Sequence, residues 1–169
     1  MDQIKDVYVL DDEIKRLKNQ NQLLEEYEGP VYNHIFRKKR GQAVLDIGCN
    51  NGMKTVERFD RKEIESVTGI EYHKELVAFA NTRYKGEKFV FYQADLEDSG
   101  LEMVLKKDMK EKKITGYDVI NISFVLMHLK EPEKLLCRLK KYLKKYDGTF
   151  YGTDIQEDTQ KIIIALRRN

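Results

Sequence analysis

Three acidic side chains, Asp46, Glu71 and Asp95, each follow a run of apolar, aromatic or β-branched residues. Such runs, for example residues 43–45, are typical of buried strands. Open α/β sheets bind ligands at the carboxyl ends of their strands, so the three carboxylates should share one pocket. A lone Asp at a strand end is more often a turn or helix-cap residue. Three acids in this order are not readily explained by turns alone.

A glycine turn follows the first of these acids, in the sequence D-I-G-C-N-N-G from Asp46 to Gly52. The dinucleotide-binding pattern G-x-G-x-x-G is not met, because Asn50 and Met53 stand at its second and third glycines. The charge of Asp46, two residues before Gly48, is a poor neighbour for a pyrophosphate and suits a ligand with an ammonium and a sulfonium group. Asn50 can still turn the chain, since Asn tolerates left-handed backbone.

The segment D-I-G-C-N-N-G resembles motif I of the class I S-adenosylmethionine-dependent methyltransferases, with Asn50 in place of the usual middle glycine. The resemblance covers about Gly41 to Ile155, because the later acids follow in the family's order. It implies an α/β fold with a doubly wound, mostly parallel sheet. It also implies S-adenosyl-L-methionine as cofactor and S-adenosyl-L-homocysteine as product.

The resemblance assigns the methionine end of the cofactor to Asp46, together with backbone at Gly48 and near Asn121. Glu71 lies about 20 residues past the glycine turn, where a carboxylate at the end of the second strand accepts hydrogen bonds from ribose hydroxyls. The two acids thus define the inner part of the predicted pocket.

The adenine is expected at the next two strand ends. Tyr72 offers a flat apolar face, while in the family the acid at Asp95 reaches the adenine amino group and the backbone of Leu96 reads a ring nitrogen. The complete set of cofactor-binding residues that we expect is Asp46, Gly48, Cys49, Asn50, Gly52, Glu71, Tyr72, Asp95, Leu96, Asn121 and Ser123.

His128 is the candidate catalytic residue. It follows the predicted fourth strand, residues 117–122, in a segment that resembles the one flanking the methionine moiety in small-molecule methyltransferases. It is either a general base for a substrate hydroxyl or amine, or a structural residue of the loop. Methyl transfer from a sulfonium depends largely on alignment, so no base is essential.

Apolar spacing predicts the remaining elements. We expect helices at residues 53–59, 74–84 and 101–113, and one from Pro132 to Asp147-Gly148 with Leu143 in its buried stripe. Further strands are expected at residues 66–71, 88–95 and 149–155, and a helix in the tail, residues 156–169. The family's last two strands would then be missing, and the fifth strand would be an exposed edge unless the tail or a second copy covers it. The sequence would be either a trimmed piece of a longer protein, which is favoured, or a minimal natural version of the fold.

The predicted division is an N-terminal helical arm, residues 1–40, and a cofactor-binding core, residues 41–169. A first helix should stop near Gly29-Pro30 and a second should span residues 31–39. The arm either forms a lid over the ligands or packs as a helix pair or coiled-coil seam, and the second alternative is favoured for any single residue. The apolar stripe of the first helix consists of Leu10, Ile14, Leu17, Asn21 and Leu24, and the candidate lid contacts are Tyr27, Tyr32 and His34.

Composition narrows the class of protein. The chain has 169 residues, a formal charge of +2, and two cysteines, Cys49 and Cys137, without metal or redox spacing. These features favour a reduced, cytoplasmic compartment and no metal site. A role with nucleic acid is unsupported, and no run is long enough to span a membrane.

The leading hypothesis is transfer of the sulfonium methyl group to an N, O or S atom of an acceptor, a small molecule being favoured over a protein. A second hypothesis is a module that binds S-adenosylmethionine without turnover, as a truncated part of a larger protein. A nucleotide-binding Rossmann protein is a distant third. The acceptor and the oligomeric state stay open.

Overall fold

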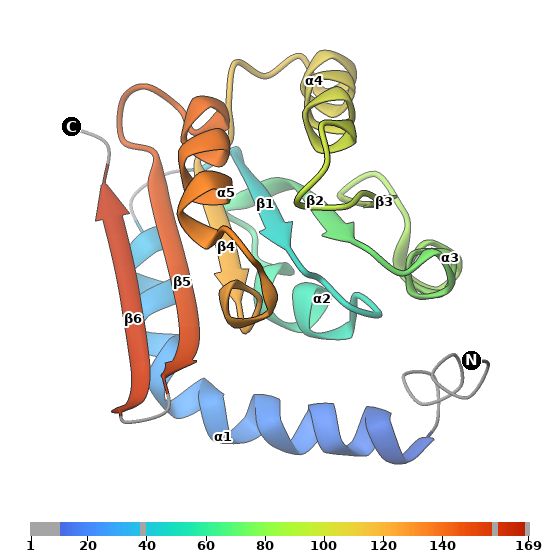
Figure 1. Cartoon of the computed structure of the whole chain (residues 1–169), viewed down its shortest axis with the longest axis vertical. Helices are drawn as coiled ribbons and strands as arrows, with labels where there is room; N and C mark the ends of the chain where they lie inside the picture. Colours follow the sequence, from blue (N-terminus) through green and yellow to red (C-terminus); the bar gives the residue numbers. More distant parts are fainter. Residues whose placement is uncertain (1–10, 38–39, 157–158, 168–169) are drawn as a thin grey trace.

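The computed structural model describes residues 11–37, 40–156 and 159–167. Within them, one sheet contains six strands in the order β3-β2-β1-β4-β5-β6 (Figure 1). The strands are β1 (Gln42–Ile47), β2 (Ile64–Glu71), β3 (Phe89–Gln93), β4 (Val119–Ser123), β5 (Thr149–Gln156) and β6 (Thr159–Arg167). The first five are parallel and β6 is antiparallel to β5. The predicted doubly wound, mostly parallel fold is confirmed.

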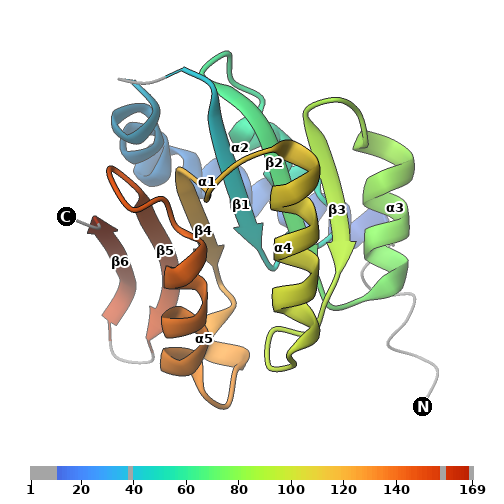
Figure 2. The same ribbon diagram turned by 90° about the horizontal axis from the view of Figure 1, so that it is seen from above.

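Helices cover both faces of this sheet. They are α1 (Asp11–Phe36), α2 (Met53–Phe59), α3 (Lys74–Tyr84), α4 (Gly100–Lys112) and α5 (Pro132–Leu139), with short 3₁₀ turns η1 (Leu126–His128) and η2 (Lys140–Tyr142). Buried residues of α1, α2 and α3 form one core with the sheet, and those of α4 and α5 form the other. Figure 2 shows α4 and α5 in front of the sheet, with α2 and part of α1 behind it.

Strand β1 sits at the centre of the sheet and faces both cores. Val44 packs into the core of α1, α2 and α3, whereas Leu45 and Ile47 pack into the core of α4 and α5. This alternation is the two-residue period of a strand buried on both faces. The strands from β1 to β3 extend to one side of β1, and those from β4 onward extend to the other side. Doubly wound sheets bind ligands in a crevice at such a switch point, here between β1 and β4.

The predicted break at Gly29-Pro30 is wrong, because α1 is a single helix that continues through Pro30 to Phe36. Gly29 has no Cβ, so the usual clash between proline and the preceding residue in a helix is relieved. Buried Leu24, Tyr32 and Phe36 anchor the helix on both sides of the proline. Figure 1 shows the ribbon of α1 changing direction along its length, and a proline is the common cause of such a kink.

Part of the N-terminal prediction lies outside the described residues. This applies to Leu10, to Lys38-Lys39, and to the side chains of Ile14, Leu17 and Asn21. Of the candidate lid contacts, Tyr32 is fully buried, whereas Tyr27 and His34 are exposed.

The predicted tail helix is also wrong, because residues Thr159–Arg167 form β6 along the edge of β5. Phe150 pairs with Leu166 and Thr153 with Ile163. The run of three isoleucines, residues 162–164, explains the difference, since β-branched side chains favour strand over helix. The tail therefore covers the edge that β5 would otherwise expose.

The helix that begins at Pro132 ends earlier than predicted, at Leu139, and continues only as η2. The backbone N–H of Tyr117 donates to the carbonyl of Tyr142 at 2.8 Å, and that of Lys144 donates to Tyr117 at 2.9 Å. Leu143 is buried as expected, but it forms a parallel bridge with Tyr117 instead of a helical turn. Pairing with Tyr117, two residues before β4, thus replaces the last predicted helical turns.

Among the described residues, no helix combines the length and the apolar character needed to cross a membrane.

The continuity of α1 through Pro30 can be tested with a double-mutant cycle. Gly29→Val should lower the free energy of unfolding by about 1–3 kcal/mol, because a β-branched residue before proline resists helical backbone. The same substitution in a Pro30→Ala background should cost much less. Urea denaturation of the four proteins measures both values, and an equal cost in the two backgrounds would contradict the explanation.

Candidate functional site

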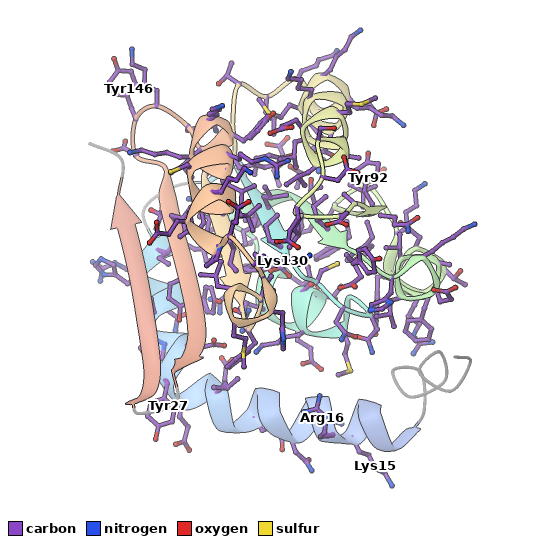
Figure 3. All side chains as sticks on the ribbon, viewed as in Figure 1. Lys15, Arg16, Tyr27, Tyr92, Lys130 and Tyr146 are labelled. Carbon is purple, nitrogen blue, oxygen red and sulfur yellow. The ribbon has the colours of Figure 1, made fainter. Side chains whose placement is uncertain are left out.

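A cleft of about 770 Å³ opens at the carboxyl ends of β1 to β4. Its size is typical of a small-molecule or cofactor site. It is lined by the turn between β1 and α2, the residues that follow β2 and β3, the segment after β4, and Arg16 of α1. Figure 1 shows the first half of α1 lying across this edge of the sheet, and Figure 3 marks Arg16 on that stretch.

Most of the residues predicted from the sequence line this cleft. They are Asp46, Gly48, Cys49, Asn50, Glu71, Tyr72, Asp95, Leu96, Ser123 and His128. Gly52 and Asn121 are not among the lining residues. Gly52 is instead a packing residue, since a Cβ there would lie 2.9 Å from Cε1 of Phe91 and 3.0 Å from Cβ of Ala80. Asn121 is fully buried beneath the cleft, where it contacts Asp46.

The glycine turn has the backbone that its sequence predicts. Gly48 has a φ of 72°, and a Cβ at this position would lie 2.2 Å from Cγ2 of Val125. Asn50 takes the left-handed conformation with a φ of 51°, and its Oδ1 accepts a hydrogen bond from the backbone N–H of Asn51 at 2.6 Å. Asn50 thus turns the chain at the place of the usual glycine, as predicted.

Glu71 ties the glycine turn to the end of β2. Its Oε2 accepts from the backbone N–H of Asn50 at 3.0 Å, and its Oε1 accepts from that of His73 at 3.0 Å. A carboxylate oxygen can accept more than one hydrogen bond, so both oxygens keep capacity for ligand hydroxyls. The carboxylate is therefore held in place at the wall of the cleft.

The loop after β3 forms the outer end of the cleft. Asp95 is exposed and accepts from the backbone N–H of Glu97 at 2.8 Å, and the exposed Tyr72 lines the same cleft. Arg138 of α5 donates to the carbonyl of Leu96 at 2.8 Å and to Oε1 of Glu102 at 2.8 Å. Arg138, which is distant in sequence, thus holds the loop after β3 in place, and its role could not be recognised from the sequence.

Asp46 is almost fully buried at the inner end of the cleft, with 5% of its surface exposed. Its Oδ2 accepts from Oγ1 of Thr55 at 2.5 Å, and its Oδ1 accepts from Nδ2 of Asn121 at 2.7 Å. Burial raises the pKa of the Asp46 carboxyl, while Arg58 and the two hydrogen bonds oppose that shift.

A buried ion pair between Glu28 of α1 and Arg58 of α2 lies beside Asp46 and is called here the Glu28–Arg58 pair. Arg58 also donates to Oγ of Ser123 at 3.2 Å, and Glu28 accepts from Oγ1 of Thr153 at 3.0 Å. The hydroxyl of Tyr32, on α1, donates to Oδ1 of Asn121 at 2.8 Å. Helix α1 is therefore bonded to α2, β4 and β5 underneath the cleft.

Sequence reasoning missed the Glu28–Arg58 pair, although a signal was present. Glu28 lies four residues after Leu24 and four before Tyr32, so it falls on the buried stripe of α1. A charged residue on such a stripe needs a buried partner. The partner itself could not be named from the sequence.

Lys54 and Phe124 meet on the side of the cleft next to α1. The Lys54 Nζ lies 5.2 Å from the centroid of the Phe124 ring and 3.8 Å from Oε2 of Glu28. Phe124 has a φ of 56°, which is strained for an aromatic residue and is typical of functional sites. Burial lowers the pKa of Lys54 to about 8, assisted by Arg58 and opposed by Glu28 and Asp46.

The remaining candidate side chains differ in character. His128 is exposed at the cleft, with its backbone N–H bonded to the carbonyl of Val125 at 3.0 Å, and its catalytic role stays a prediction. Cys49 is buried, and burial raises the pKa of its thiol well above the usual value. A thiol in that state is a turn residue and a poor nucleophile.

A family model described as a methyltransferase domain matches residues 38–166. The chain therefore belongs to the methyltransferase domain family, and its fold is that of the class I S-adenosylmethionine-dependent methyltransferases. S-adenosylmethionine is the cofactor in this family, some of whose structures contain S-adenosylhomocysteine.

Individual relatives are distant. The ubiquinone biosynthesis O-methyltransferase of Vibrio atlanticus (strain LGP32) is 27% identical over 126 residues, which are 72% of this chain and 48% of that protein. The plantazolicin methyltransferase BpumL, solved with S-adenosylhomocysteine, is 23% identical, with a TM-score of 0.58 over 90% of this chain and 57% of its own. The chain thus spans about half the length of these relatives.

The fold alone does not fix the reaction. The [4+2]-cyclase SpnF is 18% identical and reaches a TM-score of 0.58 over 81% of this chain and 46% of its own. Function must therefore be argued from the side chains that line the cleft.

The importance of the Glu28–Arg58 pair can be measured by charge removal. Glu28→Gln should lower the free energy of unfolding by about 3 kcal/mol, because it leaves the Arg58 guanidinium buried without its counter-charge. Glu25→Gln, an exposed change on the same helix, should cost less than about 0.5 kcal/mol. In chemical denaturation, Arg58→Met should lower the free energy of unfolding less in the Glu28→Gln background than in the wild type. Fully additive losses from the two substitutions would contradict the pairing.

Proposed function

We propose that the chain binds S-adenosyl-L-methionine in this cleft and transfers the sulfonium methyl group to an N, O or S atom of an acceptor, releasing S-adenosyl-L-homocysteine. One observation carries the proposal: Asp46, Glu71 and Asp95, from three strand ends, line a single cleft around a left-handed glycine turn. These are the groups that a ligand with an ammonium, a ribose and an adenine requires.

The donor set supports this cofactor over a dinucleotide. Asp46 presents a buried carboxylate at the inner end, where low dielectric strengthens its attraction for a cation and its repulsion of a phosphate. Glu71, held by two backbone N–H groups, is placed to accept from ribose hydroxyls. Tyr72 and Leu96 flank the outer end, where an apolar ring fits.

The acceptor is proposed to be a small molecule. Phe124, Met127 and Leu129, from the segment after β4, add apolar surface to the cleft. When bound, the cofactor supplies an electrophilic methyl group, and the residues of the cleft have to align the acceptor with it. His128 is placed at the rim, where it can accept a proton from an acceptor hydroxyl or amine. The free thiols of Cys49 and Cys137 favour a cytoplasmic setting.

A second candidate is binding of S-adenosylmethionine without turnover. It is kept because the chain spans about half the length of its relatives, so the activity of the whole proteins does not carry over to this chain by similarity alone. Detection of product, as opposed to cofactor binding, separates the two candidates.

Calorimetric titration with S-adenosylmethionine, S-adenosylhomocysteine and NADH tests the proposal. The wild type should bind the first two with one-to-one stoichiometry, and Asp46→Asn and Glu71→Gln should each weaken binding about tenfold or more, since each loses a charged hydrogen-bond acceptor. Glu75→Gln, an exposed matched change on α3, should bind like the wild type.

Formation of S-adenosylhomocysteine with a panel of hydroxyl, amine and thiol acceptors then reports turnover. Binding without product would favour the second candidate. Binding of NADH but of neither S-adenosyl ligand would refute the cofactor assignment and favour a nucleotide-binding protein.

A further inference from the structure

Lys54 is a charged residue of the cleft to which the proposed function gives no task. It is the second residue of α2, its side chain is 25% exposed, and it lines the cleft beside Phe124. Its ammonium group therefore reaches the space that a ligand would occupy.

The counter-charge closest to Lys54 is already engaged. Glu28 forms its ion pair with Arg58 and accepts a hydrogen bond from Thr153, whereas its Oε2 is 3.8 Å from the Lys54 Nζ. A separation of this length is a weak contact compared with a direct charged hydrogen bond.

The groups around Lys54 do not offset its burial. Glu28 and Glu25 of α1 and Asp46 of β1 attract its proton, while Arg58 on its own helix repels it. The net result is a pKa lowered to about 8, with burial as the largest cause. A buried ammonium in this state gains from any anion that approaches it.

The charges of the cleft are also arranged by sign. The lining acids Glu71, Asp95 and Glu97 follow β2 and β3, whereas the basic side chains Arg16, Lys54 and Arg58 line the cleft from α1 and α2. Asp46 is the acid that lines the cleft near Lys54, and Arg58 is already paired with Glu28. That side therefore combines a carboxylate with basic groups, which matches the two opposite charges of a free α-amino acid.

We propose that Lys54 is the anion-binding residue of this cleft and receives a carboxylate or phosphate group of a bound ligand. The inference rests on the proposed function and assigns a residue to the anionic group of the ligand, which the proposed function leaves without a partner. The anion has two possible sources: the α-carboxylate of S-adenosylmethionine, whose ammonium group lies against Asp46, or an acidic group of the methyl acceptor. In either case the anion replaces lost hydration around the ammonium and raises the Lys54 pKa.

The first experiment titrates S-adenosylmethionine and decarboxylated S-adenosylmethionine into wild type, Lys54→Met and Lys54→Arg. The decarboxylated compound keeps the sulfonium and ammonium groups and lacks only the carboxylate. Lys62→Met, an exposed change in the segment after α2, is the matched control and should bind both compounds like the wild type. The second experiment adds inorganic phosphate to protein saturated with S-adenosylhomocysteine and follows the pKa of Lys54 through its Cε–H NMR signals.

If the cofactor supplies the anion, Lys54→Met should weaken the binding of S-adenosylmethionine about tenfold and change the binding of the decarboxylated compound by no more than about twofold. Lys54→Arg, which keeps the positive charge, should bind S-adenosylmethionine like the wild type. If the acceptor supplies it, Lys54→Met should bind both compounds normally, and phosphate should raise the Lys54 pKa in the saturated wild type. If Lys54→Met binds both compounds as tightly as the wild type does, and phosphate does not move the Lys54 pKa, the proposal is overturned.

Failure of the proposed function gives a different pattern. The wild type would then bind neither S-adenosyl compound, and the phosphate titration would be carried out on the unliganded protein. A raised Lys54 pKa would still support an anion site, and an unchanged pKa would refute it.

Discussion

The Glu28–Arg58 pair is the interaction on which the site depends. Burying two charges is costly unless each is paired and hydrogen-bonded, and here Thr153 and Ser123 complete the contacts of Glu28 and Arg58. The pair brings together the N-terminal helix, the helix after the glycine turn, and the ends of β4 and β5. Movement of any one of these elements would leave a charge buried without its partner.

The same network reaches the ligand side of the cleft. Tyr32 of α1 holds Asn121, and Asn121 donates to Asp46, so the orientation of that carboxylate is set partly by the N-terminal helix. Thr55 of α2 holds the other oxygen of Asp46. A site whose side chains are fixed in this way does not have to reorganise when a charged ligand enters, and such preorganisation is what strengthens electrostatic recognition.

Local sequence patterns were sufficient for the five parallel strands, for the glycine turn and for the three strand-end carboxylates. Asn50 could be placed in left-handed backbone because the motif requires a turn there and Asn tolerates it. The break at Pro30 and the tail helix were mispredicted because packing of Tyr32 and Phe36, and pairing of Thr159–Arg167 with β5, outweighed local signals. Arg138, Arg58 and Lys54 were missed because a basic residue on a short helix looks like solvent-facing surface until its partners, distant in sequence, are known.

The most direct test of this account is a crystal structure of the chain with S-adenosylhomocysteine. The account predicts the ribose hydroxyls within hydrogen-bond distance of Glu71, the amino group beside Asp46, and the adenine between Tyr72 and Leu96, with the Glu28–Arg58 pair intact below. A ligand bound outside this cleft, or one whose adenine lies against Asp46, would contradict it.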